Sequence, residues 1–188
     1  MFKIKLYGIL FLFAIISACG NGENKKAESE SADSLSVKNL TEKKNILVFG
    51  NSLTAGLGVE PDEAFPALIG NRIDSLNLPY EVINAGLSGE TTAAGKERIN
   101  WLLKQKVDVF VLELGANDGL RGIPHTETRK NLQSIIDQVK AKYPDAKLVM
   151  TSMEVPPNMG SKYASEFRVI FPELAKDRKS TRLNSSHT

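Results

Sequence analysis

The stretch VDVFVLEL, from Val107 to Leu114, decides the fold because almost every residue in it is apolar. A strand with one solvated face alternates between apolar and polar side chains, whereas a parallel strand covered on both faces is a nearly continuous apolar run. Glycine and polar residues follow at once in GANDGLRG and end the strand. The stretch therefore predicts a central strand of a parallel sheet.

Strands and helices alternate on both sides of this stretch. Short apolar runs predict three further strands, at 45–49, 80–85 and 147–153. Apolar residues at helical spacing predict four helices, over 61–78, 91–106, 127–143 and 162–176. Such alternation with short loops predicts an α/β fold, a doubly wound parallel sheet in three α/β/α layers.

Three of these helices carry apolar residues that predict a buried face. They are Phe65, Leu68, Ile69, Ile73 and Leu76 in the first helix, Ile99, Leu102 and Leu103 in the second, and Leu132, Ile135, Ile136 and Val139 in the third.

The remaining surface is polar. Residues 45–176 carry 14 Lys and Arg against 16 Asp and Glu, so the net charge of +2 comes from the chain ends. This balance gives no reason to expect a nucleic-acid partner. We also expect a monomer.

The N-terminus is typical of a bacterial lipoprotein. Lys3 and Lys5 precede an apolar run that is too short to span a bilayer comfortably and has the pattern of a signal peptide. The run ends in ISAC, which resembles a lipobox, where the cysteine is lipidated. We expect a signal peptide over 1–19, a lipid anchor on Cys19, a disordered tether over 20–44 and a place in the bacterial cell envelope. The alternative is an ordinary signal peptide with a chance cysteine.

Ser52 follows the first predicted strand, within FGNSLTAGLG. Gly50 permits a sharp turn there, and the N-terminus of a following helix would favour developing negative charge. A serine nucleophile needs a base for its proton and donors for the oxyanion that forms. The alternative is that Asn51 and Ser52 form only a turn and a helix N-cap.

Two more candidates follow the next two strands. Gly86, in NAGLSGETT, can direct its backbone N–H into the cleft as an oxyanion donor would, although a plain turn is the alternative. Asn117, in LGANDGLRG, offers a neutral side-chain donor, while Asp118 is expected to shape the loop. Because sites in parallel sheets form outside the carboxyl ends of the strands, Ser52, Gly86 and Asn117 are expected to converge there.

Together, GNSLTAG, NAGLSGETT and LGANDGLRG resemble the first three sequence blocks of the SGNH (GDSL) hydrolases. The resemblance is closest to the thioesterase I, lysophospholipase L1 and arylesterase type, and it covers about residues 45–176. It implies a flavodoxin-like fold and a hydrolase of esters or thioesters with Ser52 as the nucleophile. The oxyanion hole would consist of the backbone N–H groups of Ser52 and Gly86 and the side chain of Asn117, with no metal or cofactor.

The chain departs from the family pattern before and after these blocks. The family usually has aspartate before the serine, but this chain has Asn51, which keeps an acceptor oxygen, so the turn is expected to survive. The family carries its base in a later Asp-x-x-His block. Here, His125 opens the third helix and is a poor candidate, and His187 has Asn184 three residues before it. Asparagine would hold an imidazole poorly or in the wrong tautomer.

After Lys176 the sequence becomes DRKSTRLNSSHT, which is polar and has no periodicity. We interpret residues 177–188 as an artefactual tail outside the family domain, appended by adapter or assembly read-through. The alternative is a natural, irregular C-terminus. In either case we expect no strand or helix in it, so the domain over 45–176 would be C-terminally incomplete, lacking its last strand, its last helix and the Asp–His pair.

The sequence thus predicts a lipid-anchored serine ester hydrolase for acyl esters or thioesters, such as lysophospholipids and aryl esters. The chain itself is expected to have little activity because the catalytic aspartate and histidine are missing. The apolar residues Leu120, Ile123, Val155 and Met159 would line an acyl groove, and the alternative is that they serve only for packing. A carbohydrate-ester deacetylase on the same fold and a non-catalytic surface binding lipoprotein are the alternatives.

Overall fold

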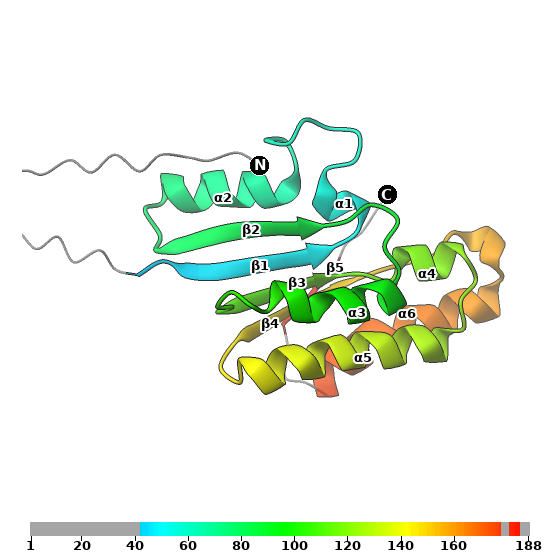
Figure 1. Cartoon of the computed structure of the whole chain (residues 1–188). Helices are drawn as coiled ribbons and strands as arrows, with labels where there is room; N and C mark the ends of the chain where they lie inside the picture. The colour runs from blue at the N-terminus through cyan, green and yellow to red at the C-terminus, as the bar shows by residue number, and fades with distance from the viewer. Residues whose placement is uncertain (1–41, 178–180, 185–188) are drawn as a thin grey trace, which may run out of the picture. The chain divides into compact units, whose positions relative to one another are not determined.

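Five parallel strands form one sheet in the order β2-β1-β3-β4-β5 (Figure 1). They are β1 (Lys44–Gly50), β2 (Tyr80–Gly86), β3 (Val109–Glu113), β4 (Lys147–Ser152) and β5 (Thr181–Asn184). The computed structural model describes residues 42–177 and 181–184, so Cys19, the signal peptide and His187 lie outside the described residues. The first four strands and the doubly wound α/β fold confirm the sequence prediction.

The register of the strands brings the ends of three of them level. Gly50, the last residue of β1, lies opposite Gly86 in β2 and Glu113 in β3. The chain runs from β1 to β2 on one side and then crosses to β3 on the other side. This reversal makes the carboxyl end of β1 the switch point of the sheet, where ligands bind in open α/β folds.

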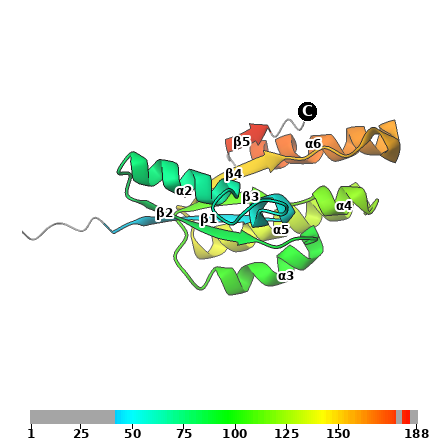
Figure 2. The ribbon, with the colours of Figure 1, turned by 90° about the horizontal axis from the view of Figure 1, so that it is seen from above.

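Helices cover the two faces of the sheet unequally. Right-handed crossovers place α2 (Phe65–Ser75) on one face and α3 (Thr92–Leu102), α5 (His125–Lys142) and α6 (Ser161–Asp177) on the other (Figures 1 and 2). Seen from above, α2 lies on the β2 and β1 side of the sheet (Figure 2). The short helices α1 (Ser52–Ala55), α4 (Ala116–Leu120) and η1 (Pro157–Met159) follow β1, β3 and β4.

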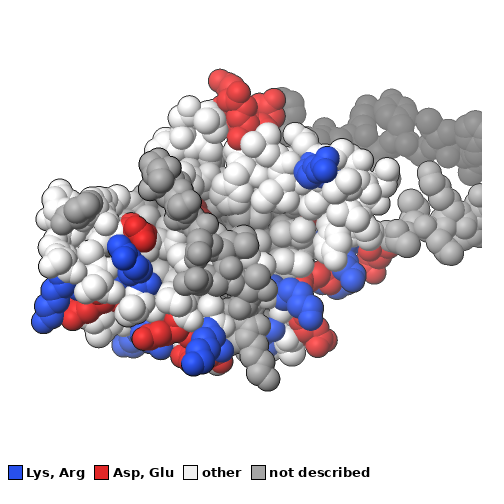
Figure 3. Space-filling model, turned by 180° about the vertical axis from the view of Figure 1, so that it is seen from behind, with Lys and Arg blue, Asp and Glu red and all other residues white. Residues whose placement is uncertain are grey.

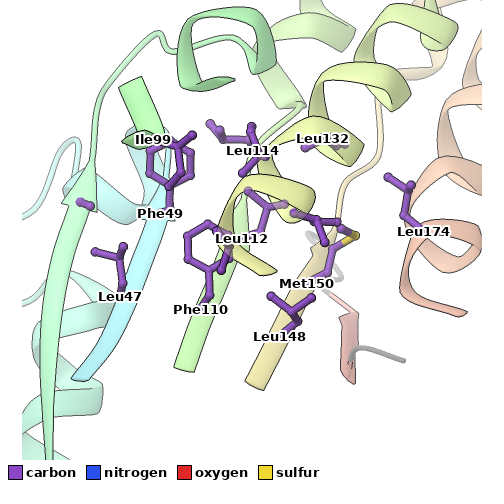
Figure 4. Packing of buried hydrophobic residues seen from close by; sticks show 14 of the residues in the cluster. Leu47, Phe49, Ile99, Phe110, Leu112, Leu114, Leu132, Leu148, Met150 and Leu174 are labelled. Carbon is purple, nitrogen blue, oxygen red and sulfur yellow. The ribbon is translucent and has the colours of Figure 1, made fainter. Parts of the chain in front are cut away.

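The main hydrophobic core lies between the sheet and the three helices α3, α5 and α6 (Figure 4). Every second residue of the central strands points into it, which is the period of a strand. The strand residues of this core are Leu47, Phe49, Phe110, Leu112, Leu148 and Met150, and the inward residues predicted for α3 and α5 are all buried. The described residues contain no helix long and apolar enough to cross a membrane.

Two elements differ from the sequence prediction. The apolar pattern predicted a first helix over 61–78, but α2 spans only Phe65–Ser75, and among the apolar residues at helical spacing Ile73 is buried while Leu68, Ile69 and Leu76 are exposed. The residues after Lys176, expected to form no element, contain β5, which pairs with β4 in parallel from Thr181 opposite Val149. Backbone hydrogen bonding to an open sheet edge gives this polar segment a strand without any apolar pattern.

Charged side chains of both signs are interspersed on the face seen from behind in Figure 3.

Candidate active site

Ser52 begins α1, a single helical turn that starts directly after β1. Asn51 is the N-cap, and its Oδ1 accepts a hydrogen bond from the Leu53 N–H at 3.2 Å. Gly56, in the left-handed conformation with φ 81°, ends the turn. Of Asn51 and Ser52, for which a turn and an N-cap were the predicted alternative, Asn51 is therefore the cap. The Ser52 hydroxyl has no hydrogen-bond partner within residues 42–177 and 181–184.

Glu113 holds this turn from the end of β3, a role that the sequence analysis missed. Its side chain is buried, and Oε2 accepts the Asn51 N–H at 3.2 Å, the Thr54 N–H at 3.3 Å and the Thr54 hydroxyl at 2.8 Å. Burial raises the pKa of Glu113, and hydrogen bonds from Thr54 and Asn51 partly oppose that rise. The only signal in the sequence is a carboxylate inside the apolar run VDVFVLEL.

Among the described residues, all but one of the backbone N–H groups of this turn have a hydrogen-bond acceptor. Asn51 and Thr54 donate to Glu113, and Leu53 donates to Asn51. The N–H groups in the first turn of a helix have no partner inside the helix. The Ser52 N–H has no acceptor among the residues that the structure describes, so it remains available to a negatively charged oxygen.

Gly86 packs tightly against the back of the same turn. Its N–H donates to Asn84 Oδ1 at 2.9 Å, and Asn84 Nδ2 donates to the Thr54 carbonyl at 2.8 Å. A Cβ at Gly86 would lie 2.2 Å from the Ala55 backbone nitrogen, so only glycine fits. To act as an oxyanion donor, Gly86 would have to give up its bond to Asn84, and that role stays a prediction.

Asn117 lies in the first turn of α4, against the loop that follows β2. Its Nδ2 donates to the Glu90 carbonyl at 3.0 Å, which uses one of the two amide hydrogens and fixes the side chain. Arg121 donates to the neighbouring Gly89 carbonyl at 3.1 Å. Gly89 is exposed at φ 78°, and within the described ranges its backbone N–H has no acceptor.

Two buried carboxylates fix the loops around Asn117. Asp118 accepts the Thr92 N–H at 2.8 Å and the hydroxyls of Thr92 and Thr128, which confirms its predicted role in shaping the loop. Glu90 forms a bidentate ion pair with Arg98, with both nitrogen–oxygen distances at 2.6 Å. Because the Arg98 guanidinium also donates to Ala85 O, the loop after β2 is tied to α3 and to the end of its own strand.

His125 begins α5, as predicted, and it interacts with another part of the molecule. Its Nδ1 lies 3.4 Å from the Glu166 carboxylate on α6. In the described part of the chain no hydrogen bond links it to Ser52. No group of three or more potential metal-ligating side chains occurs in the described ranges.

A groove of about 710 Å³ adjoins the two catalytic candidates. It runs between the residues next to Ser52 and Asn117, the loop after β4 and the start of α6. Its lining comprises Leu53, Ala116, Met153, Glu154, Val155, Pro156, Ser161, Ala164, Ser165 and Arg168. Of the four residues predicted for an acyl groove, only Val155 belongs to this lining.

Comparison with known proteins gives a consistent result. A sequence model of the GDSL-like lipase/acylhydrolase family matches residues 48–183. The chain is 35% identical over 135 residues to the esterase TesA of Pseudomonas aeruginosa and 38% identical over 135 residues to an arylesterase of Vibrio mimicus. Each match covers 71% of this chain and 66% of the relative, so the chain spans slightly less than two thirds of these relatives.

Solved structures agree with the sequence relatives. AlinE4, an SGNH-hydrolase family esterase, superposes with a TM-score of 0.71 at 38% identity, covering 76% of each chain. The crystal structure of TesA superposes with a TM-score of 0.70 at 34% identity, covering 74% of this chain and 77% of that one. The chain therefore belongs to the GDSL-like lipase/acylhydrolase family, as its three sequence blocks predicted.

Proposed function

We propose that this protein hydrolyses acyl esters or thioesters with Ser52 as the nucleophile. The observation that carries the proposal is the turn at Asn51–Thr54, in which the nucleophile's own N–H is the one without an acceptor among the described residues. Membership of the acylhydrolase family and relatives named esterase and arylesterase support the same chemistry. Small acyl esters are the proposed substrate class.

In the proposed reaction the Ser52 oxygen attacks the carbonyl carbon of the ester while its proton passes to a base. The carbonyl oxygen becomes an oxyanion, which accepts hydrogen bonds from the Ser52 N–H and from the second hydrogen of Asn117 Nδ2. The carbon–oxygen bond to the alcohol then breaks, the alcohol leaves with a proton, and water later releases the acid from Ser52. The base would belong to the Asp-x-x-His block that the resemblance implies.

As the third hydrogen-bond donor to the oxyanion we propose the backbone N–H of Gly89 in place of the backbone N–H of Gly86. The N–H of Gly86 is bonded to Asn84, whereas the N–H of Gly89 has no acceptor in the described ranges. Gly89 also precedes Glu90, whose carbonyl holds the Asn117 side chain. The oxyanion would then bind where the loop after β2 meets α1 and α4.

The groove beside Leu53 is the proposed site for the acyl chain. Its apolar side chains include Leu53, Met153, Val155 and Ala164, and Leu53 directly follows the nucleophile. A groove of this size favours an acyl group longer than acetyl, which argues against a deacetylase as the first choice. Hydrolysis of p-nitrophenyl esters from acetate to octanoate would compare the two, and a strict preference for acetate would contradict this assignment.

External imidazole tests the nucleophile because it can itself accept the proton of the Ser52 hydroxyl. We expect imidazole to accelerate release of p-nitrophenol from p-nitrophenyl butyrate by the full chain beyond its effect in solution. The Ser52→Ala variant should show only the solution rate, and Asn117→Ala should lose about 100-fold because one oxyanion donor is removed. Equal rates for the chain and for Ser52→Ala would overturn the proposal.

We also propose that Cys19 anchors the protein to a membrane of the bacterial envelope. The support is the sequence alone, namely the short apolar run followed by ISAC. Cells grown with an alkyne analogue of palmitate should incorporate it into the protein but not into the Cys19→Ser variant. Equal labelling of both, or of neither, would contradict the anchor.

A further inference from the structure

Two buried polar atoms beside the nucleophile lack a hydrogen-bond partner among the described residues. They are Asn51 Nδ2, a donor, and Glu113 Oε1, an acceptor. Asn51 is 1% exposed and Glu113 is 3% exposed, so neither atom is solvated by bulk water. Buried polar groups without partners are rare in native proteins, and two of opposite kind beside one turn, from Asn51 before α1 and from Glu113 at the end of β3, require an explanation.

The other contacts of these residues fix the orientation of both side chains. Oε2 of Glu113 already accepts three hydrogen bonds, from Asn51 and Thr54, so Oε1 is the oxygen left over. Oδ1 of Asn51 accepts the Leu53 N–H, so Nδ2 is the group left over. The Asn51 backbone N–H bonds to Oε2 of Glu113 at 3.2 Å, which holds the two residues beside each other.

We propose that Asn51 and Glu113 form one matched pair, with Nδ2 donating to Oε1, and that this pair positions Ser52 for attack. The inference rests on the proposed function of Ser52. Asn51 and Glu113 are positioning residues, because they act on the backbone on either side of the nucleophile. Together they accept hydrogen bonds from the N–H groups of Asn51, Leu53 and Thr54, which leaves the Ser52 N–H as the one without an acceptor among the described residues.

The pair requires one hydrogen between the two side chains. In Glu113→Gln the three donors still need the amide oxygen, so the new NH₂ would face the NH₂ of Asn51. Turning the Asn51 amide over only moves the conflict to the Leu53 N–H, which would then face a donor. In Asn51→Asp two acceptor oxygens would face each other unless a proton bridges them.

The double variant Asn51→Asp, Glu113→Gln restores the match with the roles exchanged. The new aspartate would accept from both the Leu53 N–H and the new side-chain amide at position 113, while the oxygen of that amide keeps the three donors. The double variant has the same net charge as the natural pair and nearly the same volume. If the residues acted only by filling space, the effects of the two substitutions would add.

The experiment is this double-mutant cycle in the full chain, with p-nitrophenyl butyrate and imidazole. Circular dichroism and thermal unfolding first establish a temperature at which all four proteins are folded. We expect Glu113→Gln to lower kcat at least 10-fold with little change in KM, and the double variant to recover to within about threefold of the natural chain. A double variant as slow as Glu113→Gln, or slower, would overturn the pairing.

A pH series adds a second readout that packing alone would not change. The groups that face Glu113 are Gly50 of β1, the N-cap residue Asn51 and Thr54 of α1, all uncharged. Asn51→Asp should therefore gain activity relative to the natural chain as pH falls and a proton bridges the two carboxyl groups. The double variant should follow the natural profile. A profile for Asn51→Asp parallel to that of the natural chain contradicts the inference.

Hydrogen exchange separates failure of the pair from failure of the proposed function. Without any Ser52-dependent reaction in the natural chain, the proposed function fails, but amide exchange still tests the pair. We expect the Thr54 and Asn51 amides to exchange faster in Glu113→Gln and to regain protection in the double variant. Protection unchanged in Glu113→Gln would refute the pairing whatever the activity.

Discussion

Substitution of Gly86 by alanine tests how closely the end of β2 packs against the nucleophile turn. The new Cβ would lie 2.2 Å from Ala55 N, 2.6 Å from the Thr54 carbonyl carbon and 2.7 Å from Ala55 Cα. All three are backbone atoms, so no side-chain rotation relieves the overlap and α1 must move. Overpacking costs about 1–3 kcal/mol, and a backbone clash belongs at the upper end, about 3 kcal/mol.

The assay is thermal and urea unfolding of Gly86→Ala beside Gly70→Ala as the matched control. A Cβ at Gly70, inside α2, meets Val82 at an ordinary 3.9 Å, and alanine in a helix is about 0.5–1 kcal/mol more stable than glycine. We expect Gly86→Ala to lower Tm by roughly 10 °C and Gly70→Ala to leave it unchanged or raise it. Equal stability of the two variants, with normal Ser52 reactivity in Gly86→Ala, would refute the packing argument.

Three further predictions follow from buried charge and from the groove. Arg98→Ala leaves the Glu90 carboxylate buried without its partner and should lower the free energy of unfolding in urea by about 3 kcal/mol. The control Lys96→Ala removes an exposed ion pair and should lower it by at most about 0.5 kcal/mol. Similar losses in the two variants would contradict this prediction. Burial raises the pKa of Glu113 above 4.5, so the folded chain binds the proton of this carboxyl group more tightly than the unfolded chain does. Proton binding therefore stabilises the fold fully below about pH 4.5, and this stabilisation is lost as pH rises through the folded pKa. Urea unfolding from pH 4 to 8 should therefore show a decline that Glu113→Gln, which has no carboxyl group at this position, lacks, and identical profiles would disprove it. Ala164→Trp should fill the groove and lower kcat/KM for octanoate more than for acetate, and an equal change for both esters would place the acyl chain elsewhere.

The sheet could be predicted from the sequence because its strands are short apolar runs between strong helical patterns. VDVFVLEL identifies β3, and the apolar faces of α3 and α5 identify the side on which the main core forms. The exposed apolar residues of α2 could not be foreseen. Their spacing is that of a buried helix face. However, α2 covers one face of the sheet, and only part of the surface of α2 contacts the sheet.

The site was predicted in part, because three motifs each follow a strand that ends at the same edge. Sequence alone could not show that the Gly86 N–H has a partner, since that bond comes from Asn84 two residues earlier. It also assigned no role to Glu113, because a carboxylate at a strand end is usually solvated and only the fold buries this one. β5 depends on pairing with an open edge, which no local pattern reveals.

The most direct test of the central claim is to locate the acyl group on the protein. The full chain would be incubated with p-nitrophenyl butyrate and imidazole, quenched in acid, digested with trypsin and analysed by mass spectrometry. The account predicts a butyryl ester on Ser52, in the peptide of residues 45–72, and no ester on that peptide in Ser52→Ala. A butyryl group on another residue, or on the same peptide of Ser52→Ala, would contradict it.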